Sequence, residues 1–198
     1  INNINGVLGG DDWIFWREPK YKYDYHDVYT SISKIKEMVK QKKYRDTSDV
    51  RNFQYSTEEV ALSNAINANK IKIPYSNYHT TAYKYDETSK TYKRWMRNKP
   101  HVLSTSESAV STKNIIIQYA KNYYLGDGDL KAGRQQLDTV GGGQGYYITN
   151  GNAIKISWKK DSRGSKTYFT DEQGNEIQLN DGPTWIQIVP VNANVVIE

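Results

Sequence analysis

Three histidines, His26, His79 and His101, are the side chains best suited to acid–base or metal chemistry in this 198-residue chain. They lie far apart in the sequence, and none has the close spacing typical of a metal site on a helix or a hairpin. We therefore expect no metal ion and no cofactor. The chain contains no cysteine, which excludes a disulfide framework, a thiolate nucleophile and a zinc–thiolate site.

His26 has the sequence neighbours that an anion site would need. Two aspartates and Tyr29 lie within three residues of it, and Arg17 precedes it, all before a predicted helix start. Free N–H groups at a helix N-terminus attract anions, and arginine can hold a phosphate or carboxylate with two hydrogen bonds. This segment predicts an anion or polymer site formed by Arg17, His26 and Tyr29. The alternative is structural: His26 and Tyr29 only tie the segment to its domain.

A second candidate site combines aromatic and basic side chains. Trp158 is followed by Lys159 and Lys160, with Arg163 close behind. Amphipathic rings beside basic residues suit glycan or peptide surfaces, so these four residues form a predicted ligand-binding surface. The alternative is that the tryptophans, like the 17 tyrosines, fill a β core.

Two further motifs resemble ligand loops only in part. Gly141-Gly142-Gly143-Gln144-Gly145 lacks the following Gly-Lys-Ser/Thr and the following helix of a nucleotide loop, so we interpret it as a bend or bulge between strands. Asp127-Gly128-Asp129 begins like a calcium loop but lacks the later ligands of an EF-hand. Serine-hydrolase and zinc-protease signatures are absent.

The composition favours a folded protein with a mildly basic surface. The 27 Lys and Arg against 22 Asp and Glu give a net charge of +5, and acidic residues interrupt nearly every basic run. Nucleic-acid binders concentrate positive charge on one face, so nucleic-acid binding is disfavoured. No run of 18 apolar residues is present.

The elements that position these residues change in type along the chain. From Val28 to Lys43, apolar residues recur at three- and four-residue steps, which predicts an amphipathic helix capped by Thr30 or Ser31. A second helix is predicted to begin at Ser56, which has capping-box spacing to a glutamate.

From about residue 70 the pattern becomes alternating, so we place a domain boundary there, between residues 1–70 and 71–198. The predicted strands are Ile71–Tyr75, Tyr78–Tyr85, Tyr92–Arg97, Asn114–Tyr124, Tyr146–Thr149, Ala153–Lys159, Tyr168–Thr170, Ile177–Leu179 and Thr184–Val189.

Three isoleucines, residues 115–117, predict a strand that is covered on both faces or lies at the centre of its sheet. Asn150-Gly151 supplies the positive φ angles of a type I′ hairpin turn. The fold class is therefore α+β, with a partial mixed N-terminal portion and a mostly antiparallel β domain, either a sandwich or a partly closed barrel.

Eight segments, in their order and spacing, resemble the YerB-like family of bacterial lipoproteins, whose function is unknown. They are Phe15–Lys20 (FWREPK), His26–Ser31 (HDVYTS), Ile73–Ser76 (IPYS), Tyr92–Met96 (YKRWM), Lys99–Val102 (KPHV), Lys113–Tyr119 (KNIIIQY), Ser157–Lys160 (SWKK) and Pro183–Pro190 (PTWIQIVP). The resemblance spans almost the whole chain. It departs locally, because the family tends to have Ala-Pro-His-Asn where this chain has Asp24-Tyr25-His26-Asp27.

The resemblance implies a protein exported by a Gram-positive or related bacterium and anchored to the outer face of the cell membrane by an N-terminal lipid. It also implies further residues before the counterpart of Ile1, so that residues 1–70 form the second half of a mixed first domain. No catalytic residue is implied.

Two functional hypotheses follow. The first is a non-enzymatic binding or scaffold lipoprotein whose partner is a cell-wall polymer or another envelope protein. The second is an enzyme that acts on an anionic envelope substrate through Arg17 and His26. Nucleic-acid binding ranks third.

Overall fold

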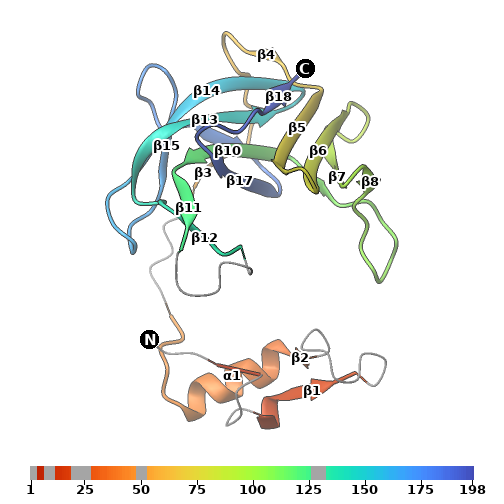
Figure 1. Ribbon diagram of the computed structural model, residues 1–198, viewed down its shortest axis with the longest axis vertical. Helices are drawn as coiled ribbons and strands as arrows, with labels where there is room; N and C mark the ends of the chain where they lie inside the picture. Colours follow the sequence, from red (N-terminus) through yellow and green to blue (C-terminus); the bar gives the residue numbers. More distant parts are fainter. Residues whose placement is uncertain (1–3, 7–11, 19–27, 48–52, 126–132) are drawn as a thin grey trace. The chain divides into compact units, whose positions relative to one another are not determined.

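The computed structural model describes residues 4–6, 12–18, 28–47, 53–125 and 133–198, and the chain divides into two compact units, Ile1–Arg51 and Asn52–Glu198 (Figure 1). Within the described residues, no helix is long and apolar enough to cross a membrane.

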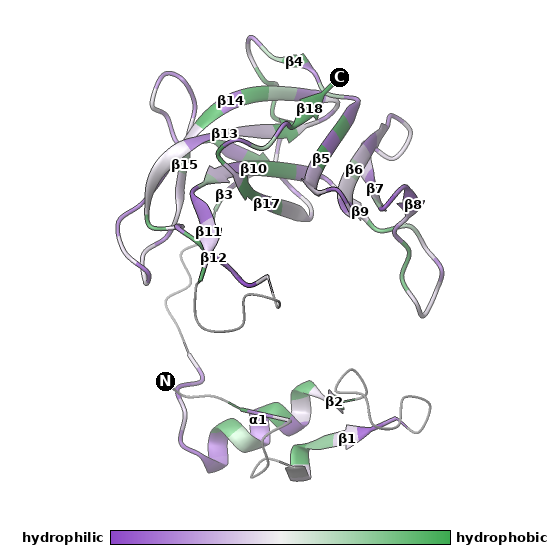
Figure 2. Ribbon diagram, viewed as in Figure 1, coloured by the Kyte–Doolittle hydropathy of each residue, from purple (hydrophilic) through white to green (hydrophobic). Residues whose placement is uncertain are grey.

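The first unit combines a short strand pair with one helix. It contains η1 (Asp12–Ile14), β1 (Phe15–Arg17), β2 (Val28–Thr30) and α1 (Ile32–Gln41). The Ser31 hydroxyl accepts a hydrogen bond from the Lys34 N–H at 3.3 Å and caps the helix. Among the described residues of this unit, Met38 on α1 and Ile14 are the buried apolar side chains, and Figure 2 shows polar and apolar residues along α1.

The predicted helix is confirmed, but it begins later than Val28. Residues Val28–Thr30 pair with β1 in an antiparallel ladder, and the Thr30 hydroxyl donates to the Ile14 carbonyl at 2.8 Å. Thr30 is therefore a strand residue, and Ser31 is the cap.

The second unit is built on two six-stranded sheets. The central sheet has the order β15-β14-β13-β10-β17, with β4 beside β14; the outer sheet has the order β18-β5-β6-β7-β8, with β9 beside β7. Their strands are β4 (Ile66–Asn67), β5 (Lys70–Ser76), β6 (His79–Asp86), β7 (Thr91–Met96), β8 (Lys99–Pro100), β9 (Ser111–Thr112), β10 (Asn114–Ala120), β13 (Gly141–Thr149), β14 (Asn152–Lys160), β15 (Tyr168–Thr170), β17 (Thr184–Pro190) and β18 (Val196–Ile197). Two further pairs are β3 (Gln54–Ser56) with β16 (Gln178–Asn180), and β11 (Asn122–Tyr124) with β12 (Gln135–Leu137).

Strand β10 lies between β13 and β17, and both of its faces are buried. One core cluster joins the two sheets and includes Ile71, Tyr83, Tyr92, Ile115, Ile117, Ile148 and Val189. The other face of the central sheet carries a second cluster, which includes Ile116, Tyr147, Trp158, Phe169 and Leu179 and is covered by Phe53 and Leu62. Figure 2 shows the hydrophobic character of β10.

The predicted α+β class and the doubly covered central strand are thus confirmed. The two sheets of the second unit share a core, and none of the sheets among the described residues closes into a barrel.

Residues 53–69 join the second unit, although the sequence pattern placed the boundary at residue 70. Strand β3 pairs in parallel with β16, and β4 pairs with β14. The prediction of a helix that begins at Ser56 is wrong, since Ser56 ends strand β3 and residues 57–69 contain no helix. The backbone groups of this segment are used in tertiary contacts instead, since the Val60 N–H donates to the Asn180 side chain at 2.8 Å and the Ala68 N–H to the Gly151 carbonyl at 2.8 Å.

The turn chemistry is confirmed at the β13–β14 hairpin, where Asn150 has φ 50° and Gly151 has φ 72°. The predicted strands Tyr168–Thr170 and Ile177–Leu179 flank a turn sequence, Gln173-Gly174-Asn175, that predicts a hairpin between them, but this hairpin forms only in part. Strand β15 is followed by one bridge between Thr170 and Glu176, after which β16 pairs with β3.

Gly145 allows β13 to pack closely against β10, which yields a first prediction. A Cβ atom at this position would lie 2.1 Å from the Ile117 carbonyl oxygen, and both strands are held by the core. We expect Gly145→Ala to lower the free energy of unfolding by about 1–3 kcal/mol in urea denaturation, because overpacking forces the strands apart. Gly164→Ala is the matched control, since nothing lies within 4 Å of its Cβ position. Equal stability of the two variants would contradict the close approach.

Candidate binding pocket in the central sheet

The ladder between β10 and β13 opens into a pocket. The regular pairing of these strands ends at Gln118 and Gly145. The two segments are hydrogen-bonded again where the Asp138 N–H donates to the Lys121 carbonyl at 2.9 Å. Between these two points of pairing, two residues separate Gln118 from Lys121, whereas six residues separate Asp138 from Gly145. The strands must therefore separate, and they leave a pocket of about 740 Å³, a size typical of small-ligand sites.

Trp158 replaces the missing strand contact at this opening. Its indole N–H donates to the Tyr119 carbonyl at 2.9 Å, and it lies opposite Gly143 in the β13–β14 ladder. A Cβ atom on Gly143 would lie 2.7 Å from the indole nitrogen and 3.0 Å from that carbonyl oxygen. The glycine is thus required for the indole to reach across to β10, and both residues line the pocket.

The remaining lining combines two aromatic rings with charged groups. Tyr119 and Tyr146 are partly buried, with ring centroids 6.4 Å apart in an edge-to-face arrangement. Burial raises the pKa of Tyr119, and the neighbouring Tyr146 raises it further, so its hydroxyl remains a hydrogen-bond donor at neutral pH. Lys121 and Lys155 are exposed and outnumber Asp138, so the lining carries an excess of positive charge. This arrangement suits a ligand that has an apolar ring or chain and an anionic group.

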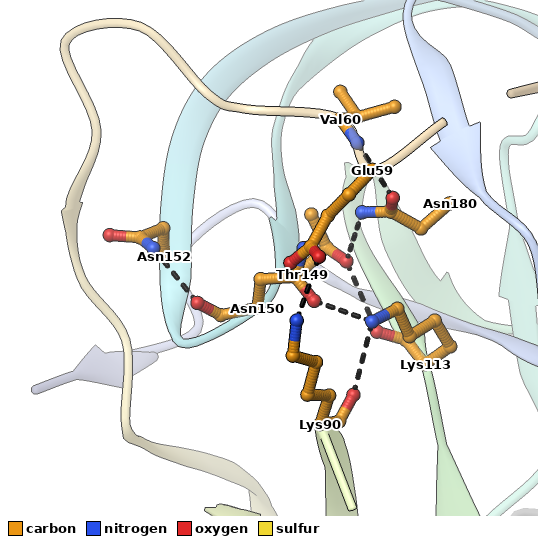
Figure 3. Close-up of polar contacts among 8 residues, drawn as sticks. All are labelled: Glu59, Val60, Lys90, Lys113, Thr149, Asn150, Asn152 and Asn180. Carbon is orange, nitrogen blue, oxygen red and sulfur yellow. Dashed lines mark hydrogen bonds and ion pairs between the residues drawn. The ribbon is translucent and has the colours of Figure 1, made fainter. Parts of the chain in front are cut away.

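A polar network fixes the hairpin at the opposite end of β13 (Figure 3). The Lys113 ammonium donates to the Asn150 side chain at 2.6 Å and to the Lys90 carbonyl at 3.3 Å, and the Lys90 ammonium pairs with Glu59 at 2.8 Å. Lys90 and Glu59 are each more than half exposed, so this ion pair adds little stability. Its contribution is geometric, because it ties the segment that contains Glu59 to the β6–β7 turn.

The buried part of this network uses amides and hydroxyls. Asn180 accepts from the Val60 N–H at 2.8 Å and donates to the Thr149 hydroxyl at 2.9 Å, as drawn in Figure 3. Asn114 accepts from the Tyr147 hydroxyl at 3.0 Å. These groups are buried and satisfied, so the β10–β13 ladder is rigid on one side of the pocket.

Residues 71–186 match the family described as "Protein of unknown function (DUF3048) C-terminal domain", and the match covers more than half of the chain. The chain belongs to the DUF3048 family. No curated protein matches it.

The crystal structure of the YerB protein from Bacillus subtilis has a similar fold, with a TM-score of 0.73 and 24% sequence identity. The similarity covers 92% of this chain and 59% of that chain, so this DUF3048 member spans about three-fifths of the length of its structural neighbour. The resemblance to the YerB-like family is confirmed in family and in fold.

The predicted anion site of the first unit is described only in part. Arg17 and Tyr29 lie on the paired strands β1 and β2, whereas His26 lies outside the described residues, as do Asp127 and Asp129. Tyr29 is 39% exposed and stacks on Trp16 at 6.4 Å. The involvement of His26 stays a prediction.

The predicted surface around Trp158 is not formed as expected. Trp158 is only 4% exposed and belongs to the core, whereas Lys159 points to the opposite face of β14, because successive strand residues alternate. Lys159 lies 3.2 Å from Asp161, and the Lys160 ammonium donates to the Ser165 carbonyl. Arg163 is exposed in the turn that follows β14. Trp158 thus contributes to the pocket from the core side, away from Lys159.

Other side chains of the pocket were not predicted from the sequence, among them Tyr119, Lys121, Tyr146 and Lys155. The available signal was the glycine run at residues 141–145, which was interpreted as a bend or bulge. The structure places it in β13, where glycine marks a close approach of other groups to the strand. Among the described residues, no group of three or more His, Asp or Glu side chains could hold a metal ion.

The burial of Trp158 yields a second prediction. We expect Trp158→Ala to lower the free energy of unfolding by about 3–5 kcal/mol, because it leaves a cavity and removes the bond to Tyr119. Lys159→Ala, on the adjacent exposed position, should change it by less than about 0.5 kcal/mol. Urea denaturation monitored by far-UV circular dichroism measures both values. A Trp158→Ala protein as stable as the wild type would place this ring outside the core.

Proposed function

We propose that the second unit is a binding module that takes an anionic part of a cell-envelope polymer or protein into the pocket between β10 and β13. The observation that carries this proposal is the opening of a buried ladder into a cavity lined by two tyrosines and two lysines. An opening of this kind removes hydrogen bonds from an interior pair of strands of the central sheet, which favours a functional origin.

The lining indicates how a ligand would be held. The partly buried rings of Tyr119 and Tyr146 offer apolar surface to a sugar ring or a peptide side chain, and their hydroxyls offer hydrogen bonds. The ammonium groups of Lys121 and Lys155 would attract an anionic group of the ligand. Because the network at Asn114 and Asn180 already fixes the strands, binding would require little reorganisation.

We also propose that the protein acts outside the cytoplasm of a Gram-positive or related bacterium, held at the cell membrane by an N-terminal lipid. The support is the resemblance of its sequence to a family of lipoproteins. Membership of the DUF3048 family itself leaves the function open.

A pull-down with isolated Bacillus subtilis cell walls tests the proposal. We expect the wild-type protein to bind the walls, and the double variant Lys121→Ala, Lys155→Ala to bind about tenfold more weakly, which corresponds to about 1.4 kcal/mol. The binding should also weaken as salt is raised, because exposed charges are screened. Lys72→Ala on β5 is the control, since Lys72 is exposed on the outer sheet and does not line the pocket.

Two results would count against this function. Wild-type protein that fails to sediment with the walls would remove the proposed ligand. Equal binding by the double variant and by Lys72→Ala would move the binding site away from the pocket.

A further inference from the structure

A buried arginine lies between the two sheets of the second unit, at the other end of β10 from the pocket. Arg94 on β7 is 7% exposed, and its guanidinium carbon lies 4.4 Å from the ring centroid of Trp185 on β17. Trp185 is paired with Ile115, whereas the pocket begins at Tyr119 on the same strand. The arginine is therefore a separate feature of the core.

The groups that contact Arg94 are neutral. Its Nη1 lies 2.7 Å from the Nδ1 atom of His101, and its Nη2 donates to the Thr81 hydroxyl at 3.3 Å. Because a guanidinium can only donate, the Nδ1 atom of His101 must accept, so this imidazole is uncharged and carries its proton on Nε2. Tyr83 is also close, but burial raises its pKa to about 12, so it supplies no negative charge at neutral pH.

The positive charge of Arg94 thus has no counter-charge in the part of the chain that the structure describes. No carboxylate of those residues lies within ion-pair distance of it, and its Nε atom is buried without a hydrogen-bond partner. A buried charge is strongly unfavourable unless it is paired and hydrogen-bonded, and a buried donor without a partner is rare. The cation–π contact with Trp185 offsets only part of this cost.

We propose that Arg94 anchors a binding site for a carboxylate group, which displaces the His101 imidazole from Nη1 and supplies the counter-charge that the buried guanidinium lacks among the described residues. The charges support a carboxylate, since one negative charge neutralises the single guanidinium, whereas a phosphate dianion would leave a buried negative charge. His101 is the replaceable partner: its ring is partly exposed, and it lies in the segment that follows β8. This site is independent of the proposed function of the pocket.

Nuclear magnetic resonance of the folded wild-type protein tests the proposal directly. The Nε–H group of Arg94 gives its own ¹⁵N–¹H signal, which triple-resonance spectra connect to its backbone. We expect this signal to shift with added sodium acetate and to saturate, whereas sodium chloride at equal ionic strength leaves it unchanged. The Nε–H signal of Arg97, which is exposed next to β7, is the internal control and should not saturate.

A variant and a second anion sharpen the test. His101→Ala removes the competing acceptor, so it should bind acetate at least threefold more tightly than the wild type. Sodium phosphate should produce a smaller shift than acetate. The proposal is overturned if the Arg94 signal does not saturate with acetate, if chloride shifts it equally, if phosphate binds more tightly, or if a folded His101→Ala protein binds acetate more weakly. The wild-type titration decides whether the site exists even if His101→Ala does not fold.

Discussion

Strand β10 is buried on both faces from Asn114 to Gln118, so the polar groups of this stretch need partners inside the protein. Its apolar side chains alternate between two core clusters, and its backbone is paired with β13 on one edge and β17 on the other. This double burial explains why Gly145 cannot carry a side chain, since β13 must approach the Ile117 carbonyl closely. It also explains why the end of the β10–β13 ladder requires a substitute donor, which the Trp158 indole supplies at the Tyr119 carbonyl.

Two polar clusters in this core differ in whether their buried groups have hydrogen-bond partners. The amide of Asn114 and the side chains around it are buried and satisfied by one another, as expected of a polar network that specifies one packing arrangement. Arg94 is buried to a similar degree, yet its Nε atom has no partner and its charge has no counter-ion among the described residues. The first cluster stabilises the fold, whereas the second lowers stability unless something further binds.

Local sequence rules predicted the elements of the second unit well and their long-range pairing poorly. The alternation of buried and exposed residues from Lys70 onward and the Asn150-Gly151 turn depend on neighbouring residues, so both can be predicted from the sequence. The helix predicted at Ser56 failed because a distant amide, Asn180, takes the backbone N–H of Val60. The segments that carry the family resemblance contain Arg94, His101 and Trp185, but nothing in their spacing indicates that they meet across two sheets. The position of Trp158 shows the same limit, because the aromatic–basic pattern is compatible with a surface or a core.

The pocket and Arg94 lie near opposite ends of β10, and the structure gives a reason for this arrangement. Strand β10 is paired on both edges and packed on both faces over most of its length, so groups placed at either end of it hold a fixed geometry. At one end the strands separate and expose backbone and rings; at the other end they bring Trp185 onto the guanidinium. The burial of β10 therefore allows the polar groups near its two ends to be held in place before any ligand arrives.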